Sequence, residues 1–147
     1  WVIGYGVIQA IAPKLLRAGS HAPDGRSARL WIFGLVLITV LIALAVQFGV
    51  AAEIAVLGGL LVFGLVFAVN SSLHSYLILA YADGDKVAMN VGFYYMSNAI
   101  GRLTGTILSG LAYMYGGLVG CLVVSAAFLL VGWVISFALP DAKSAAA

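Results

Sequence analysis

The chain has 147 residues, of which 64% are hydrophobic and only 8% are charged. A soluble globular domain has about 45–50% apolar and about 25% charged residues, so this composition excludes an ordinary soluble domain. The formal net charge of +2 says little about partners, and we expect no nucleic acid among them. The single Cys121 excludes a disulfide within the chain and a cysteine-based metal site.

Long apolar segments separated by short breaks predict about five transmembrane helices. A helix that crosses the bilayer needs about 20 apolar residues, and five segments approach or exceed this length. They run approximately over residues 1–16, 30–49, 54–82, 87–115 and 118–139. Strict apolar–polar alternation, which would indicate a membrane β-barrel, is absent from the sequence. We therefore predict an all-α membrane protein, a polytopic transmembrane helix bundle.

The breaks contain residues that end helices. The stretch 17–29 is the one clearly polar loop, with glycine, proline and several charges. Asp83 and Asp85 flank a glycine, which predicts a turn rather than a metal-binding acidic pair. Gly116 and Gly117 predict a tight turn between the last two segments.

The start of the chain, Trp1, already lies in an apolar segment. Neither a charged n-region nor a small-residue cleavage site is visible, so we expect no signal peptide. The sequence indicates a piece of a longer protein.

Basic residues fall on one side of the predicted membrane. With five alternating spans, six of the seven lie in loops or tails on the same side: Lys14, Arg17, Arg26, Arg29, Lys86 and Lys143. The seventh, Arg102, lies inside a span. Because Lys and Arg mark the cytoplasmic side, we predict a cytoplasmic C-terminus.

Four polar residues recur at intervals of four in the segment 87–115, namely Asn90, Tyr94, Asn98 and Arg102. This spacing places them on one helix face that drifts slowly around the helix axis. A charge at bilayer depth is costly and usually faces a water-filled cavity or a partner. We therefore predict a cavity-lining helix of a transporter, in which Arg102 and its neighbours bind an anion. The alternative is a structural Arg102 paired with a backbone carbonyl or an acid of another helix.

A second row on the same segment consists of Gly101, Gly105 and Ser109. Small residues at this spacing favour the close approach of another helix, so we expect a packing surface here.

Three polar residues in other segments complete the candidate substrate site. Asn70 and His74 share a face of the segment 54–82. His74 could donate to an anion or relay a proton, or it could be hydrogen-bonded within the bundle. Gln9 could line the cavity or form an interhelical hydrogen bond.

Motifs for catalysis are missing from the sequence. It contains no phosphate-binding glycine-rich loop, no His/Glu metal pair and no nucleophile beside a base. We therefore expect neither an enzyme nor a bound cofactor.

The stretches GYGVIQAIAPKLLR and NSSLHSYLILAYADGDKVAMNVGFYYMSNAIGRLTGT, with the following LSGLAY, resemble the organoarsenical efflux transporters. This family belongs to the major facilitator superfamily, and the five spans would correspond to spans eight to twelve of its C-terminal half. The loop PKLLRAGSHAPDGRSAR matches the superfamily's basic cytoplasmic loop only weakly, because the Gly-x-x-x-Asp core is missing.

The resemblance implies a multi-pass protein of the bacterial inner membrane that exports 1-arseno-3-phosphoglycerate. A partner glyceraldehyde-3-phosphate dehydrogenase would form this small anion from arsenate, and its export would give arsenate resistance. Arg102 and His74 would hold one anionic end, and the missing N-terminal half would supply further basic residues.

Two alternatives remain open at the level of the sequence. A proton-coupled drug or metabolite exporter of the same superfamily would need a membrane-embedded acid in the missing half. A membrane enzyme or helper subunit would need a catalytic cluster, to which only Asp83 and Asp85 could contribute.

Overall fold

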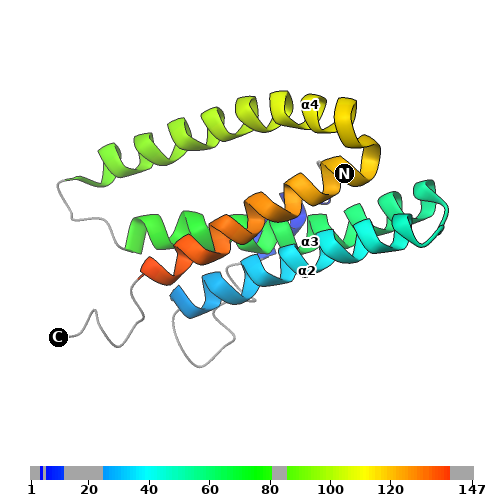
Figure 1. Cartoon of the computed structure of the whole chain (residues 1–147). Coiled ribbons are helices and arrows are strands. Elements are labelled where there is room, and N and C mark those ends of the chain that lie inside the picture. Colours follow the sequence, from blue (N-terminus) through cyan, green and yellow to red (C-terminus); the bar gives the residue numbers. More distant parts are fainter. Residues whose placement is uncertain (1–3, 5, 12–24, 81–85, 140–147) are drawn as a thin grey trace.

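The computed structural model describes residues 4, 6–11, 25–80 and 86–139, and the regular structure within them is helical (Figure 1). The helices are α2 (Gly25–Gln47), α3 (Ala52–Ala80), α4 (Val87–Ile135) and the short 3-10 helix η2 (Ser136–Ala138), and residues 4 and 6–11 are also helical. Three stretches are long and apolar enough to cross a membrane, namely Gly25–Gln47, Ala52–Ala80 and Val87–Ala138. The prediction of an all-helical protein with helices that could span a membrane is therefore confirmed.

The described helices pack around α2. It lies against α3 on one side and against the second half of α4 on the other (Figure 1). Its buried residues recur every three or four positions, as one face of a helix requires: Gly25, Ala28, Ile32, Leu35, Val36, Thr39, Ile42 and Ala43. A Cβ added at Gly59 of α3 would meet the side chain of Ile42, so this glycine allows the two helices to approach closely.

A Schellman motif ends α2 and turns the chain into α3. Gly49 has φ 86°, a left-handed conformation that favours glycine. The Val50 N–H donates to the Ala45 carbonyl over 3.0 Å, and the Gly49 N–H donates to the Val46 carbonyl over 3.2 Å. These bonds satisfy carbonyls at the helix end. The break lies where the sequence predicted it, between the segments 30–49 and 54–82.

The helix α4 bends back on itself at Gly117, whose φ of 58° and ψ of −153° are not helical. We call residues 87–116 the outer arm and residues 118–135 the inner arm. Figure 1 shows the inner arm beside α2, whereas the outer arm stands apart from α2 and α3. The bend coincides with the turn that Gly116 and Gly117 predicted between two apolar segments.

The first turn of α2 corrects the prediction that residues 17–29 form a loop. Residues 25–29 are helical because this turn has a packed side. Ala28 is fully buried in a cluster with Leu73 and Leu77. Arg29 lies over the ring of Phe137, with its guanidinium carbon 5.2 Å from the ring centroid. The polar composition of this stretch did not reveal that Ala28 is buried and that Arg29 contacts an aromatic ring.

Apart from Arg102 in the outer arm, the described charges lie at the two ends of the bundle. Arg26, Arg29 and Lys86 lie near the start of α2 and the start of α4, which share one end in Figure 1. Glu53, in the first turn of α3, lies at the opposite end. Several sequence predictions lie outside the described residues: most of the span 1–16, the remainder of the polar loop, the turn at 83–85 and the tail after residue 139.

Candidate functional site

A cavity of about 480 Å³ lies between α3 and the two arms of α4. Its polar lining comes from α3 and the outer arm, and we call it the polar cavity after six residues: Asn70, Ser71, His74, Tyr94, Ser97 and Asn98. Its remaining walls include Ile32 of α2 and Phe128 of the inner arm. Four of the seven predicted site residues therefore come together in one cavity.

A second cavity of about 400 Å³ continues along the outer arm toward its start. It shares His74, Tyr94 and Ser97 with the polar cavity and adds the predicted site residue Asn90. The two cavities thus form one path beside the outer arm, with His74 at the junction.

The hydrogen bond of His74 defines which ring nitrogen is available. Nδ1 lies 2.9 Å from the backbone carbonyl of Asn70, one turn earlier on α3. Because a carbonyl oxygen only accepts, Nδ1 carries the proton and donates. In the neutral ring, Nε2 is then an acceptor. The sequence left two alternatives for His74, a cavity-lining residue or a residue hydrogen-bonded within the bundle. The structure combines them, because His74 lines the cavity and also bonds to the Asn70 carbonyl.

Asn70 is buried on α3, and its Oδ1 has no hydrogen-bond partner among the described residues. Its backbone carbonyl accepts a hydrogen bond from His74, whereas its side-chain amide oxygen accepts none from the described residues. A buried polar atom without a partner is destabilising by about 1–3 kcal/mol. Such an atom beside a cavity is a candidate for ligand binding.

Arg102 lies at the margin of the face that lines the cavities. A step of four residues advances about 40° beyond one helical turn, so the three steps from Asn90 accumulate about 120°. Arg102 is exposed and does not line either cavity. Within the described part of the chain it forms no ion pair, and the only described acid is Glu53. Among the described residues, Arg102 therefore lies beside the cavity lining rather than in it, and its role at the substrate stays a prediction.

Gln9 forms a hydrogen bond to α3 rather than lining the polar cavity. Its Nε2 donates to Ser71 Oγ over 3.3 Å, which ties the helical residues 6–11 to α3. This is the interhelical bond that the sequence allowed as an alternative.

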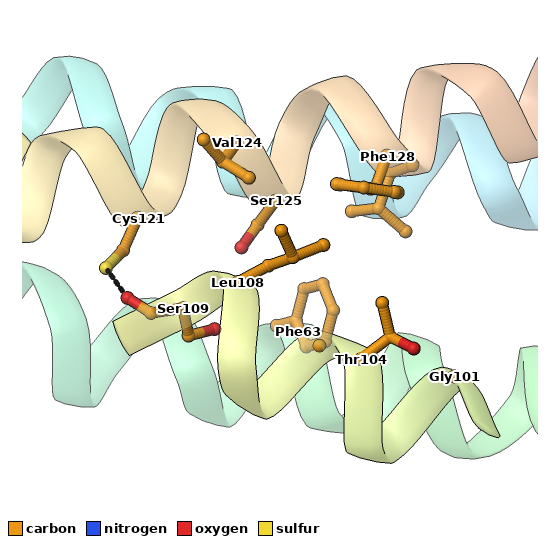
Figure 2. A pocket seen from close by; sticks show the side chains of 11 residues that line it. Phe63, Gly101, Thr104, Leu108, Ser109, Cys121, Val124, Ser125 and Phe128 are labelled. Atoms are coloured by element: carbon orange, nitrogen blue, oxygen red, sulfur yellow. Dashed lines mark hydrogen bonds between the residues drawn. The ribbon is translucent and has the colours of Figure 1, made fainter. Parts of the chain in front are cut away.

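A third cavity, of about 360 Å³, lies between the arms near the bend of α4. Figure 2 shows Thr104, Leu108 and Ser109 of the outer arm facing Val124 and Phe128 of the inner arm, with Phe63 of α3 at one side. The Cys121 thiol donates to the Ser109 carbonyl over 3.3 Å.

The small-residue row contributes to this third cavity instead of packing against a helix. A Cβ added at Gly101 or at Gly105 would have no atom within 4 Å among the described residues. The expected close contact is therefore not formed here, because the outer arm stands away from its neighbours.

Ser97 and Ser71 are the polar lining residues of this cavity that were not predicted as site residues. Ser97 follows Tyr94 by three residues, and a spacing of three shares a helix face as well as a spacing of four does. That signal was present, but the row at intervals of four did not include it.

Among the described residues, no three His, Cys, Asp or Glu side chains lie close enough together to hold a metal ion. Comparisons with protein families, with curated proteins and with solved structures return no match for this chain. Its function is therefore inferred from its residues and their geometry.

Proposed function

We propose that the chain forms part of a secondary transporter whose substrate enters the polar cavity. The supporting observation is the cavity itself, in which six polar side chains from two helices gather inside an apolar bundle. Its volume of about 480 Å³ falls in the range of ligand pockets. Polar groups at bilayer depth are expensive and typically line substrate paths.

The proposed substrate is a small organic anion, specifically 1-arseno-3-phosphoglycerate, exported across the bacterial inner membrane to give arsenate resistance. The resemblance of residues 4–17 and 70–106 to the organoarsenical efflux transporters supports this choice. The hydroxyl of Tyr94 and the amide of Asn98 supply neutral donors for anionic oxygens. Positive charge then comes from Arg102, beside the same helix face, and from the rest of the transporter.

A proton-coupled exporter of a drug or metabolite is the second candidate. One observation favours it: among the described residues that line the polar cavity, His74 is the one with a basic side chain, and histidine commonly serves as a proton shuttle in proteins. None of the described residues that line this cavity is Lys or Arg.

The test uses the full-length protein in everted membrane vesicles from an arsenate-sensitive bacterium. Radiolabelled arsenate is supplied with glyceraldehyde 3-phosphate, NAD and the dehydrogenase. We expect uptake only with active dehydrogenase, and a loss of about tenfold in Asn98→Ala, as for a lost hydrogen bond to a charged group. Thr106→Ala is the matched control, because this exposed hydroxyl lies on the same arm and donates to the Arg102 carbonyl over 2.9 Å rather than lining the polar cavity.

Uptake of label without the dehydrogenase would contradict the organoarsenical substrate. Equal uptake by Asn98→Ala and Thr106→Ala would contradict the polar cavity as the substrate site. His74→Gln separates the two candidates, because glutamine keeps a hydrogen-bonding group but cannot be protonated. Loss of pH-driven accumulation with retained substrate exchange would favour the proton-coupled exporter.

A further inference from the structure

A groove of about 570 Å³ lies at the basic end of the bundle, away from the polar cavity. It is formed by the first turns of α2 and the last turns of α4 with η2. Six residues line it: Arg26, Arg29, Leu30, Phe33, Trp133 and Phe137. Two arginines therefore share one groove with aromatic and aliphatic walls.

The aromatic walls form a continuous cluster of rings in tilted and edge-to-face contact. The ring of Trp133 lies 5.5 Å from that of Phe33 and 5.0 Å from that of Phe137, measured between centroids. Arg29 lies over Phe137 in a cation–π contact. Leu30 is 73% exposed and Phe137 58% exposed. Apolar surface this open faces hydrocarbon when the helices cross a bilayer.

The position of the groove along the helices places its charges at headgroup level. Arg26 and Arg29 belong to the first turns of a helix that is apolar enough to span the membrane. Arginines at such ends extend toward the interface, and tryptophan is enriched there. The one described acid, Glu53, lies at the other end of the bundle.

We propose that this groove binds an anionic phospholipid. The lipid phosphate is held by Arg26 and Arg29, because a guanidinium offers paired donors to phosphate oxygens. The part of the acyl chain nearest the headgroup lies against Phe33 and Leu30. Basic pockets between membrane helices bind anionic lipid headgroups in this manner. An inorganic phosphate would satisfy the arginines but would leave the apolar walls uncovered.

Native mass spectrometry of the delipidated full-length protein tests the proposal. The protein is titrated with phosphatidylglycerol and, separately, with phosphatidylcholine of the same acyl chains. We expect phosphatidylglycerol to bind more tightly than phosphatidylcholine. Arg26→Gln should weaken the binding of phosphatidylglycerol about fivefold, as for the loss of one basic residue near an anionic headgroup. Lys86→Gln is the matched control, because it removes the same charge at the same end outside the groove.

Arg26 is exposed, so its substitution is expected to leave the fold intact, and circular dichroism of the variant checks this. Arg29→Gln is a second variant that removes a charge from the groove. Leu30→Asn tests the apolar wall, and it should weaken the binding of both lipids. Equal weakening by Lys86→Gln and Arg26→Gln would overturn the proposal in favour of diffuse surface charge. Binding of inorganic phosphate or glycerophosphoglycerol as tight as that of the lipid would overturn the lipid as occupant. None of these readouts depends on transport.

Discussion

Asn70 is the residue at which stability and the proposed function conflict. Its Oδ1 is buried and has no partner among the described residues. The energetic cost of such an atom is tolerated in native proteins mainly where it has a role. Asn70 lines the polar cavity, so a rotation of its amide would bring the oxygen or the nitrogen to a substrate group. This makes Asn70 a sharper test of the cavity than the exposed Arg102.

Replacing Asn70 with leucine should separate the two properties. Leucine is similar in size to asparagine and removes the amide oxygen that lacks a partner. The free energy of unfolding should therefore stay unchanged or rise by about 1–3 kcal/mol. Uptake in vesicles should fall at least tenfold. The control is Thr39→Val, which removes a buried hydroxyl that already donates to the Leu35 carbonyl over 2.8 Å. It should lower stability by about 0.5–1.5 kcal/mol and spare transport. Destabilisation by Asn70→Leu with full transport would contradict a role in the site.

At the level of the element, the bend of α4 determines where the cavities lie. A Cβ added at Gly120 would come within 2.9 Å of the Ala112 carbonyl, so the two arms are close just beyond the bend. Farther from the bend the arms diverge, and the cavities lie between them and α3. The backbone of Gly117 permits this geometry, because its φ and ψ fall in a region nearly restricted to glycine.

Gly117→Ala should therefore destabilise the protein by about 1–3 kcal/mol through backbone strain alone, since a Cβ there would meet no described atom. Gly116→Ala is the matched control. Gly116 precedes the bend in helical backbone and is also open, so alanine should be neutral or stabilising by up to about 1 kcal/mol. Thermal unfolding in detergent, followed by circular dichroism, measures both. Similar effects of the two variants would show that the bend does not depend on the glycine conformation.

On the scale of the whole molecule, the exposed surface of the outer arm indicates which surroundings, water or lipid, suit the fold. No residue of this fully described arm is buried, and most of its large apolar side chains are exposed. Leu103 is 66% exposed and lies on the face opposite to Asn98. Such a surface suits lipid or further helices rather than water.

Cysteine accessibility can distinguish the two faces of the outer arm. In a Cys121→Ala background, Asn98→Cys should react with a charged maleimide at least tenfold faster than Leu103→Cys, because only the cavity face meets water. Substrate should protect Asn98→Cys. Both positions lie on the same arm, five residues apart, which is about 7.5 Å along the helix. Comparable rates at the two positions would argue against a membrane-embedded outer arm.

The elements of this protein follow closely from its sequence, because helix length and helix ends respond to local signals. Long apolar runs predicted α2, α3 and both arms of α4. The break at Gly49 and the bend at Gly117 depend on backbone conformations that glycine adopts easily. The start of α2 was the exception, since Ala28 is covered by residues of α3 that are distant in the sequence.

The tertiary structure alone decided which face of the outer arm lines the cavities. Spacings of three and of four both keep residues on one side of a helix, so the sequence could not decide whether Ser97 or Arg102 lines a cavity together with Tyr94. The positions of α3 and the inner arm made that choice, bringing Ser97 into two cavities and leaving Arg102 at the edge. The same positions turned Gly101 and Gly105 toward open space. Orientation about a helix axis depends on contacts with distant segments, and no local pattern encodes them.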